Sequence, residues 1–201
     1  MKIKFCGFTR DEDVRAAIDL GVDAIGLNLA RGPRKITSER AADLARLIPP
    51  FITAVALFVD ADDLTILEAM RATRCTAVQL HGNEPPELAA RLRTRFPVIK
   101  AFAIKDAAAF AVVRGYPADA YLLDAAVPGV AGGSGIAWDH HLLAGVTLDR
   151  PVILAGGLNP TSVAPAVAAT RPYGVDVASG IESTPGVKDV ALMRAFISAC
   201  R

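Results

Sequence analysis

Two residues that could exchange protons with a substrate each close a short apolar run of this chain. Cys6 closes the run 2–5, and Asp124 closes the run 120–123. A thiol acts as a base only as the thiolate, and a neighbouring cation such as Lys4 favours that form. A carboxyl group at the end of an apolar strand is costly to bury without a task or a partner. Two roles are therefore open for Cys6: a general base, or a small buried hydrophobic residue. Asp124 is either a general acid or a structural residue that caps a helix or forms a salt bridge.

Two further polar residues have an ordinary and a chemical interpretation. Arg34 lies in the basic turn 31–35, which is either solvated or a clamp for an anion, because arginine binds carboxylates through two hydrogen bonds. His81 follows the run 77–80 and is either a hydrogen-bonded scaffold residue or part of a catalytic site. No two of the three histidines have the spacing of metal ligands on a shared face, so we expect no metal site.

Two loops have the composition of a phosphate site. Residues 155–159 read Ala-Gly-Gly-Leu-Asn, and residues 178–182 read Ala-Ser-Gly-Ile-Glu. Each alone could be a plain turn. If they follow the last two strands of a barrel, they can bind phosphate together through backbone N–H groups, because glycine lets the backbone approach an anion closely.

Eight apolar runs, each followed by a segment with helical spacing, must position these residues. The predicted strands are 2–5, 24–27, 54–59, 77–80, 98–102, 120–123, 152–154 and 174–177. The predicted helices are 12–20, 38–48, 62–72, 87–95, 106–113, 138–144, 161–169 and 188–199, with Ser38 and Asp62 as N-caps. Eight such units predict an α/β fold, a (β/α)8 barrel that forms one domain over 1–201. An open doubly wound sheet is disfavoured because the turn 6–10 holds one glycine and lacks the dinucleotide-binding pattern.

Alternation along each strand predicts which side chains face the barrel lumen, because the outer face lies under helices and should be apolar. Ile3 and Phe5 are therefore expected to face outwards. The polar residues expected to face inwards are Lys4, Cys6, Gln79, His81, Lys100, Asp124 and Asp176. Cys6, His81, Asp124 and Asp176 would then lie at the carboxyl ends of strands, where barrel active sites are built.

Composition excludes several other classes of protein. Lys and Arg number 22 against 21 Asp and Glu, which gives no electrostatic footprint for general nucleic-acid binding. Three cysteines without a Cys-x-x-Cys motif do not form a disulfide framework or a zinc ribbon, and they are typical of a reducing cytoplasm. The uncharged stretch 151–170 holds three prolines, so it predicts strand, loop and helix, with no membrane span. The first residues show no apolar signal-peptide segment.

Several motifs in a fixed order resemble the phosphoribosylanthranilate isomerase family of tryptophan biosynthesis. Each motif alone is weak, but together they cover nearly the whole chain. They are Lys4-Phe5-Cys6-Gly7-Phe8-Thr9, Gly32-Pro33-Arg34, Val78-Gln79-Leu80-His81-Gly82-Asn83-Glu84, Leu122-Leu123-Asp124, Gly132-Gly133-Ser134-Gly135, Leu154-Ala155-Gly156-Gly157-Leu158-Asn159-Pro160, Asp176-Val177-Ala178-Ser179-Gly180-Ile181-Glu182 and Pro185-Gly186-Val187-Lys188-Asp189.

The resemblance implies the Amadori rearrangement of N-(5′-phosphoribosyl)anthranilate, a small phosphosugar, without cofactor or metal. By the same resemblance Cys6 is the general base, Asp124 the general acid, and Arg34 faces the anthranilate group. We expect Gly156, Gly157, Ser179 and Gly180 to hold the 5′-phosphate, and His81 and Asp176 to orient the substrate or act electrostatically. We expect no nucleic-acid or membrane partner, a cytoplasmic location, and a monomer or homodimer.

The chain departs from the family pattern at two places. The loop 29–34 is about one residue shorter than is common, with Lys35 where an aromatic residue is usual, which bears on the reach of Arg34. Trp138 stands where phenylalanine is usual. Two other functions compete: a barrel isomerase for another phosphosugar, such as the histidine-pathway aminoaldose, and a non-catalytic phosphometabolite-binding barrel. The first commonly uses two aspartates, which Cys6 argues against, and the second should lose the acid or the base.

Overall fold

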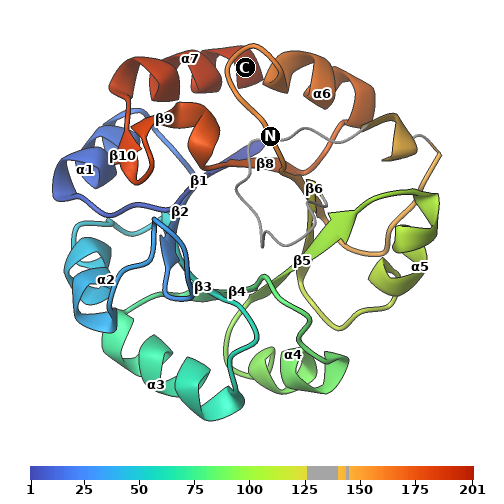
Figure 1. Ribbon diagram of the computed structural model, residues 1–201, viewed down its shortest axis with the longest axis horizontal. Helices are drawn as coiled ribbons and strands as arrows, with labels where there is room; N and C mark the ends of the chain where they lie inside the picture. The colour runs from blue at the N-terminus through green and yellow to red at the C-terminus, as the bar shows by residue number, and fades with distance from the viewer. Residues whose placement is uncertain (126–139, 144) are drawn as a thin grey trace.

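Eight parallel strands form a closed barrel in chain order, as the sequence predicts (Figure 1). The structure is a computed structural model, described over residues 1–125, 140–143 and 145–201. β1 pairs with β8 to close the ring. The strands are β1 (Lys2–Cys6), β2 (Ala24–Asn28), β3 (Thr53–Phe58), β4 (Ala77–Leu80), β5 (Val98–Ile104), β6 (Ala120–Ala125), β7 (Val152–Leu154) and β8 (Gly174–Val177).

Helices surround the barrel and cover its outer face (Figure 1). The α-helices of the described residues are α1 (Asp11–Asp19), α2 (Ser38–Ala45), α3 (Asp63–Thr73), α4 (Pro86–Leu92), α5 (Phe110–Val113), α6 (Val163–Thr170) and α7 (Val190–Cys200). Three 3-10 helices accompany them: η1 (Ala107–Ala109), η2 (His140–Leu143) and η3 (Ser179–Ile181). The predicted helix 138–144 is described only over η2, and Trp138 and the motif 132–135 lie outside the described residues.

One predicted helix cap is confirmed and one is wrong. Asp62 caps α3 by accepting a hydrogen bond from the Thr65 backbone N–H at 2.7 Å. Ser38 is already the first residue of α2, whose N-cap is Thr37. Thr37 has the extended backbone that an N-cap needs, and its side chain accepts from the backbone N–H of Arg40 at 3.2 Å.

A short antiparallel hairpin follows β8 and was not predicted. It consists of β9 (Glu182–Thr184) and β10 (Val187–Lys188). Pro185 and Gly186 lie at its turn, and Gly186 has a φ of 85°. Proline followed by a glycine with positive φ is the pattern of a type II turn, so the Pro-Gly pair was the available signal.

The core has two layers, and they show that the orientation predicted for β5 is wrong. Most buried side chains pack between the strands and the helices, while Ala101, Leu122, Ile153 and Ala155 form a small apolar cluster with Ile99 and Ala120. Because that second cluster fills the lumen, Ile99 faces inwards and Lys100 outwards. The segment 98–102 is apolar on both faces except at Lys100, so alternation alone does not decide its orientation.

Lys100 faces outwards because its ammonium group forms an ion pair there with the buried carboxylate of Glu84. Its Nζ lies 3.0 Å from Glu84 Oε2 and donates to the Gly82 carbonyl at 2.6 Å. A buried amine needs such partners to offset its lost hydration.

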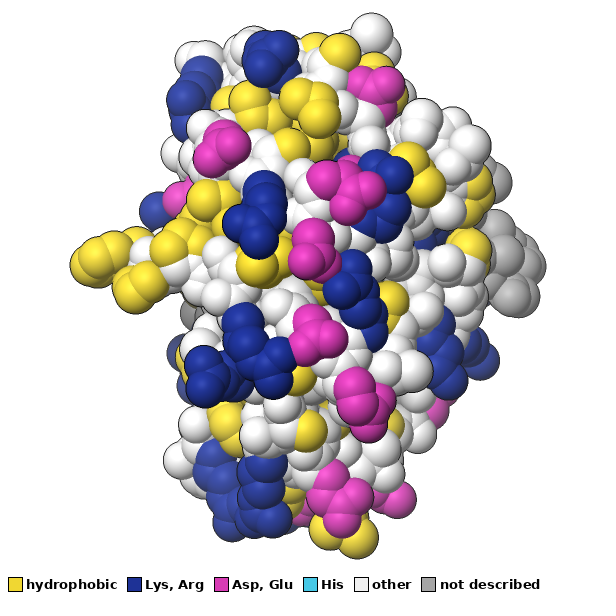
Figure 2. Space-filling view, turned by 90° about the vertical axis from the view of Figure 1, so that its left-hand side faces the viewer, with side chains coloured by type: hydrophobic (Ala, Val, Ile, Leu, Met, Phe, Trp, Pro, Cys, Tyr) yellow, Lys and Arg dark blue, Asp and Glu magenta, His cyan; other side chains and the backbone are white. Residues whose placement is uncertain are grey.

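The surface carries charges of both signs, interspersed on the face seen in Figure 2. This distribution agrees with the balanced composition of the chain. Among the described residues, no helix is long and apolar enough to cross a membrane.

Candidate active site

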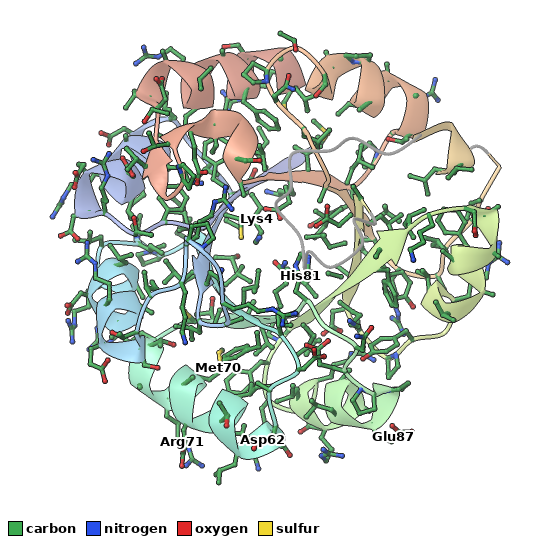
Figure 3. All side chains as sticks on the ribbon, viewed as in Figure 1. Lys4, Asp62, Met70, Arg71, His81 and Glu87 are labelled. Carbon is green, nitrogen blue, oxygen red and sulfur yellow. The ribbon has the colours of Figure 1, made fainter. Side chains whose placement is uncertain are left out.

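A cavity of about 290 Å³ opens at the carboxyl ends of the strands and collects nearly all of the predicted site residues. Lys4 and His81 lie towards the centre of the ring of strands (Figure 3). The residues that line the cavity include Cys6, Arg34, His81, Asp124, Gly156, Gly157, Asp176 and Ser179. Gly180 is the one predicted site residue that does not line it.

Cys6 ends β1 and lies beside the buried ion pair of Lys4 and Asp176. Lys4 Nζ donates to Asp176 Oδ1 at 2.9 Å, and both side chains are buried. Burial raises the pKa of the Cys6 thiol, and the charge of Asp176 raises it further, whereas the cations Lys4 and Lys188 oppose that rise. The predicted cation beside the thiol is therefore present, but burial outweighs its effect on the thiol pKa.

A glycine on the neighbouring strand makes room for this thiol. Gly26 of β2 pairs in register with Cys6. A Cβ at Gly26 would lie 2.6 Å from Cys6 Sγ and 3.1 Å from Lys4 Nζ. No larger residue fits there without displacing the thiol or the ammonium group.

Asp124 is the next-to-last residue of β6 and belongs to a chain of hydrogen bonds that crosses to β4. Its Oδ1 accepts from the Ala125 backbone N–H at 2.7 Å, and its Oδ2 lies 3.2 Å from His81 Nε2. His81 Nδ1 lies 2.8 Å from Gln79 Nε2. His81 is thus joined to the predicted acid, and Gln79 lies behind it.

Arg34 reaches the cavity although its loop is short. Asn28, the last residue of β2, holds that loop by donating to the Arg31 carbonyl at 2.9 Å and by accepting from the Ala30 N–H at 2.9 Å. The side chain of Arg34 lies across Gly7, where a Cβ would be 2.4 Å from Arg34 Cδ. Lys35 is exposed.

Two charged residues of the hairpin complete the site and were not predicted to contribute to it. Glu182 Oε2 lies 2.6 Å from Arg34 Nη2, and Glu182 Oε1 lies 2.7 Å from Lys188 Nζ. Lys188 Nζ also donates to the carbonyl of Cys6 at 2.6 Å. Both residues occur in the motifs of the sequence, but apolar periodicity carries no information about the partner of a charged side chain.

The two predicted phosphate loops meet at the cavity, with different tasks for their glycines. Gly156 and Gly157 have φ angles of 84° and 66°, a conformation that other residues rarely adopt. A Cβ at Gly180 would lie 2.0 Å from the Leu158 carbonyl oxygen. Gly180 therefore allows the two loops to pack closely, and Ser179 lies at the cavity itself.

The site provides a thiol and a carboxyl group around one cavity, each with a charged or hydrogen-bonding neighbour. Such a pair can remove one proton and supply another during an isomerisation. Over the part of the chain that the structure describes, no group of three His, Cys, Asp or Glu side chains could hold a metal ion. The three cysteines are all free.

Known proteins share both the sequence and this architecture. The family model of N-(5′-phosphoribosyl)anthranilate isomerase matches residues 3–199. The N-(5′-phosphoribosyl)anthranilate isomerase of Myxococcus xanthus is 47% identical over 207 residues, which cover 100% of this chain and 96% of the relative.

Solved structures of the same family have the same fold as this chain. That of the phosphoribosyl anthranilate isomerase from Thermotoga maritima has a TM-score of 0.93 at 34% identity, covering 99% of this chain and 98% of the other. One with reduced 1-(o-carboxyphenylamino)-1-deoxyribulose 5-phosphate has a TM-score of 0.90 at 33% identity, covering 99% and 97%. One of monomers of the dimeric Thermotoga maritima enzyme has a TM-score of 0.90 at 31% identity, covering 99% and 97%. The chain belongs to the N-(5′-phosphoribosyl)anthranilate isomerase family.

Proposed function

We propose that this chain isomerises N-(5′-phosphoribosyl)anthranilate to 1-(2-carboxyphenylamino)-1-deoxyribulose 5-phosphate in tryptophan biosynthesis, with Cys6 as base and Asp124 as acid. The observation that carries these roles is that Cys6 and Asp124 line one cavity together with Arg34 and the two phosphate loops. The cavity thus offers one partner for each part of the substrate: an acid–base pair for the sugar, a cation for the carboxylate and backbone N–H groups for the phosphate.

The reaction begins with ring opening. Asp124 gives its proton to the furanose ring oxygen, and the bond from that oxygen to C1′ breaks as the nitrogen lone pair forms the C1′=N bond. The product of this step is a protonated Schiff base, and Asp124 becomes a carboxylate. His81 Nε2, 3.2 Å from Asp124 Oδ2, is placed to stabilise that charge.

The second step is proton abstraction. The Cys6 thiolate removes the proton from C2′, the C1′=C2′ bond forms, and the electron pair of the C=N bond returns to nitrogen. The resulting enolamine tautomerises to the ketose when the 2′-hydroxyl loses its proton and C1′ gains one. Lys4, held by Asp176, favours the thiolate that this step requires. Acid and base roles of this kind each contribute about 10²–10⁴ in rate.

The remaining predicted residues bind and position the substrate. Arg34 receives the anthranilate carboxylate, because its planar guanidinium matches a carboxylate. Gly156, Gly157 and Ser179 hold the 5′-phosphate, and Gly180 keeps their two loops in contact. Asp176 acts on the reaction through Lys4. None of these steps requires a cofactor or a metal.

The first test is a steady-state assay with freshly formed phosphoribosylanthranilate, following loss of its fluorescence with and without a chelator. Turnover that resists the chelator is expected. Asp124→Asn should nearly abolish turnover while a product analogue still binds, whereas loss of both would give Asp124 a structural role. If wild type binds phosphate analogues without turnover, the histidine-pathway aminoaldose becomes the next substrate to assay, and failure there leaves a non-catalytic barrel.

We also propose that the protein works in the cytoplasm as a homodimer. Three free cysteines support the location. For the dimer, Phe51 is fully exposed, with a φ of 76°, in the loop before β3 at the end of the barrel opposite the cavity. The related enzyme of Thermotoga maritima is dimeric, and Phe51 is the exposed apolar side chain at which we expect a second copy of this chain to pack.

Sedimentation analysis tests this surface. Wild type is expected at twice the 21.1 kDa chain mass, and Phe51→Ser as a monomer. Leu64→Ser, which alters an exposed apolar residue on α3, is the matched control and should leave the dimer intact. A monomeric wild type would disprove the homodimer.

A further inference from the structure

A buried amide behind His81 makes one side-chain hydrogen bond within the described part of the chain, where it could make several. Gln79 has no exposed surface, its Nε2 lies 2.8 Å from His81 Nδ1, and its Oε1 has no hydrogen-bond partner among the described residues. An amide oxygen buried in this way costs free energy of folding. Its register neighbours on β3 and β5 are Leu57 and Ile99, so an apolar side chain would suit this layer of the barrel. Folding alone therefore does not account for a glutamine here.

The single hydrogen bond decides which nitrogen of His81 carries the proton. When Gln79 Nε2 donates to Nδ1, that nitrogen must be bare, and a neutral imidazole then carries its proton on Nε2. His81 Nε2–H can donate to Asp124 Oδ2, which lies 3.2 Å away. The opposite tautomer would set two acceptors against each other as soon as Asp124 is ionised.

We propose that Gln79 is a positioning residue that holds His81 in the Nε2–H tautomer, so that His81 stabilises the Asp124 carboxylate formed at ring opening. The inference rests on the proposed role of Asp124 as the acid. Gln79 lies in the wall of the cavity with no exposed surface, and its side-chain contact is with His81. It acts only through the nitrogen of His81 that faces away from Asp124.

The 15N chemical shifts of the His81 imidazole, measured by NMR, report its tautomer in the absence of substrate. The chain has three histidines, so 15N-histidine labelling gives few signals, and His81→Asn identifies the pair that belongs to His81. Wild type is expected to show a bare Nδ1 and a protonated Nε2. In Gln79→Glu the carboxylate accepts from Nδ1, which should become protonated. In Gln79→Leu the preference for one tautomer should be lost.

Activity and stability together separate positioning from a structural role. Gln79→Leu is expected to lower kcat about tenfold or more with KM within twofold, the pattern for an interaction that matters in the transition state. Its Tm should equal or exceed that of wild type, because the unpaired Oε1 is gone. In the His81→Asn background the same change should leave kcat unaltered, because the coupling runs through His81.

Three results would overturn the inference: a wild-type His81 with its proton on Nδ1, chemical shifts that are the same in wild type and both Gln79 variants, or a Gln79→Leu variant that loses stability but keeps its kcat. Absence of turnover in wild type would instead count against the proposed reaction. The chemical shifts would still report the tautomer in that case, so the two failures are distinguishable.

Discussion

The guanidinium of Arg34 donates two hydrogen bonds to the carboxylate of Glu182, from Nε to Oε1 at 2.8 Å and from Nη2 to Oε2 at 2.6 Å. The two residues are 148 positions apart in the chain. Glu182 is in turn held by Lys188, whose side chain is 0% exposed. A bidentate pair fixes both the position and the plane of a guanidinium. Glu182 therefore sets the direction in which Arg34 faces the cavity.

Removing the charge of Glu182 should weaken substrate binding. In Glu182→Gln, Arg34 loses its fixed plane, and we expect KM to rise about tenfold, equivalent to roughly 1.4 kcal/mol, with kcat changed by much less. Steady-state kinetics measure this. Asp119→Asn is the matched control, because Asp119 forms a similar two-nitrogen pair with Arg93 outside the cavity lining and should not alter KM. An unchanged KM in Glu182→Gln would remove Glu182 from the site.

The same residue should make stability depend on acid pH. Burial alone would raise the pKa of Glu182, but its hydrogen bonds from Arg34 and Lys188 outweigh this and hold that pKa below its ordinary value of 4.5. Its contribution is therefore complete above pH 4.5 and is lost as the pH falls through the lowered folded-state pKa. Urea unfolding at several pH values should show a steeper acid loss in wild type than in Glu182→Gln. Equal slopes would contradict the assignment.

Replacing the thiol should remove most of the activity without harming the fold. Cys6→Ser is expected to lower kcat by about 10²–10⁴, because a serine hydroxyl is a far weaker base than a thiolate. The matched control is Cys75→Ser, a buried cysteine that does not line the cavity. Product-analogue binding should survive in Cys6→Ser. Activity near that of wild type in this variant would take Cys6 out of the mechanism.

The two charges beside Cys6 should move its titration in opposite directions. Burial raises the pKa of the thiol above its ordinary value of 9.0, so the Cys6 thiolate of the free protein should form mainly above that pH. Lys4→Met removes a cation and should raise the pKa further. Asp176→Asn removes an anion and should lower it. Titration of the thiolate by its ultraviolet absorbance, taken as the difference from Cys6→Ser, measures both, and shifts of the same sign would refute this account.

A methyl group at Gly180 should disturb the phosphate loops. Its Cβ would lie 2.0 Å from the Leu158 carbonyl, so Gly180→Ala must push the two loops apart. We expect KM to rise at least tenfold and inhibition by inorganic phosphate to weaken in parallel. Ala178→Gly, a neighbouring change that only removes a methyl group, serves as control. Phosphate inhibition at wild-type strength in Gly180→Ala would place the phosphate elsewhere.

Local patterns were sufficient for the barrel and for most of the site. Alternating apolar runs separated by segments of helical period predict eight units, and a closed parallel sheet brings the ends of all eight strands to one mouth. Cys6, His81, Asp124 and Asp176 therefore meet for a reason already visible in the chain. Each of them is a polar residue at or next to the end of an apolar strand.

Tertiary structure alone decided the features that depend on partners far apart in sequence. Lys100 faces outwards because it forms an ion pair with Glu84. Gly180 is required because the carbonyl oxygen of Leu158 lies where a Cβ would be. Arg34 owes its orientation to Glu182. Periodicity records which face of a strand or helix is apolar, but it does not record which distant charge or carbonyl will lie opposite a given side chain. That choice is made only when the barrel closes and its loops pack against one another.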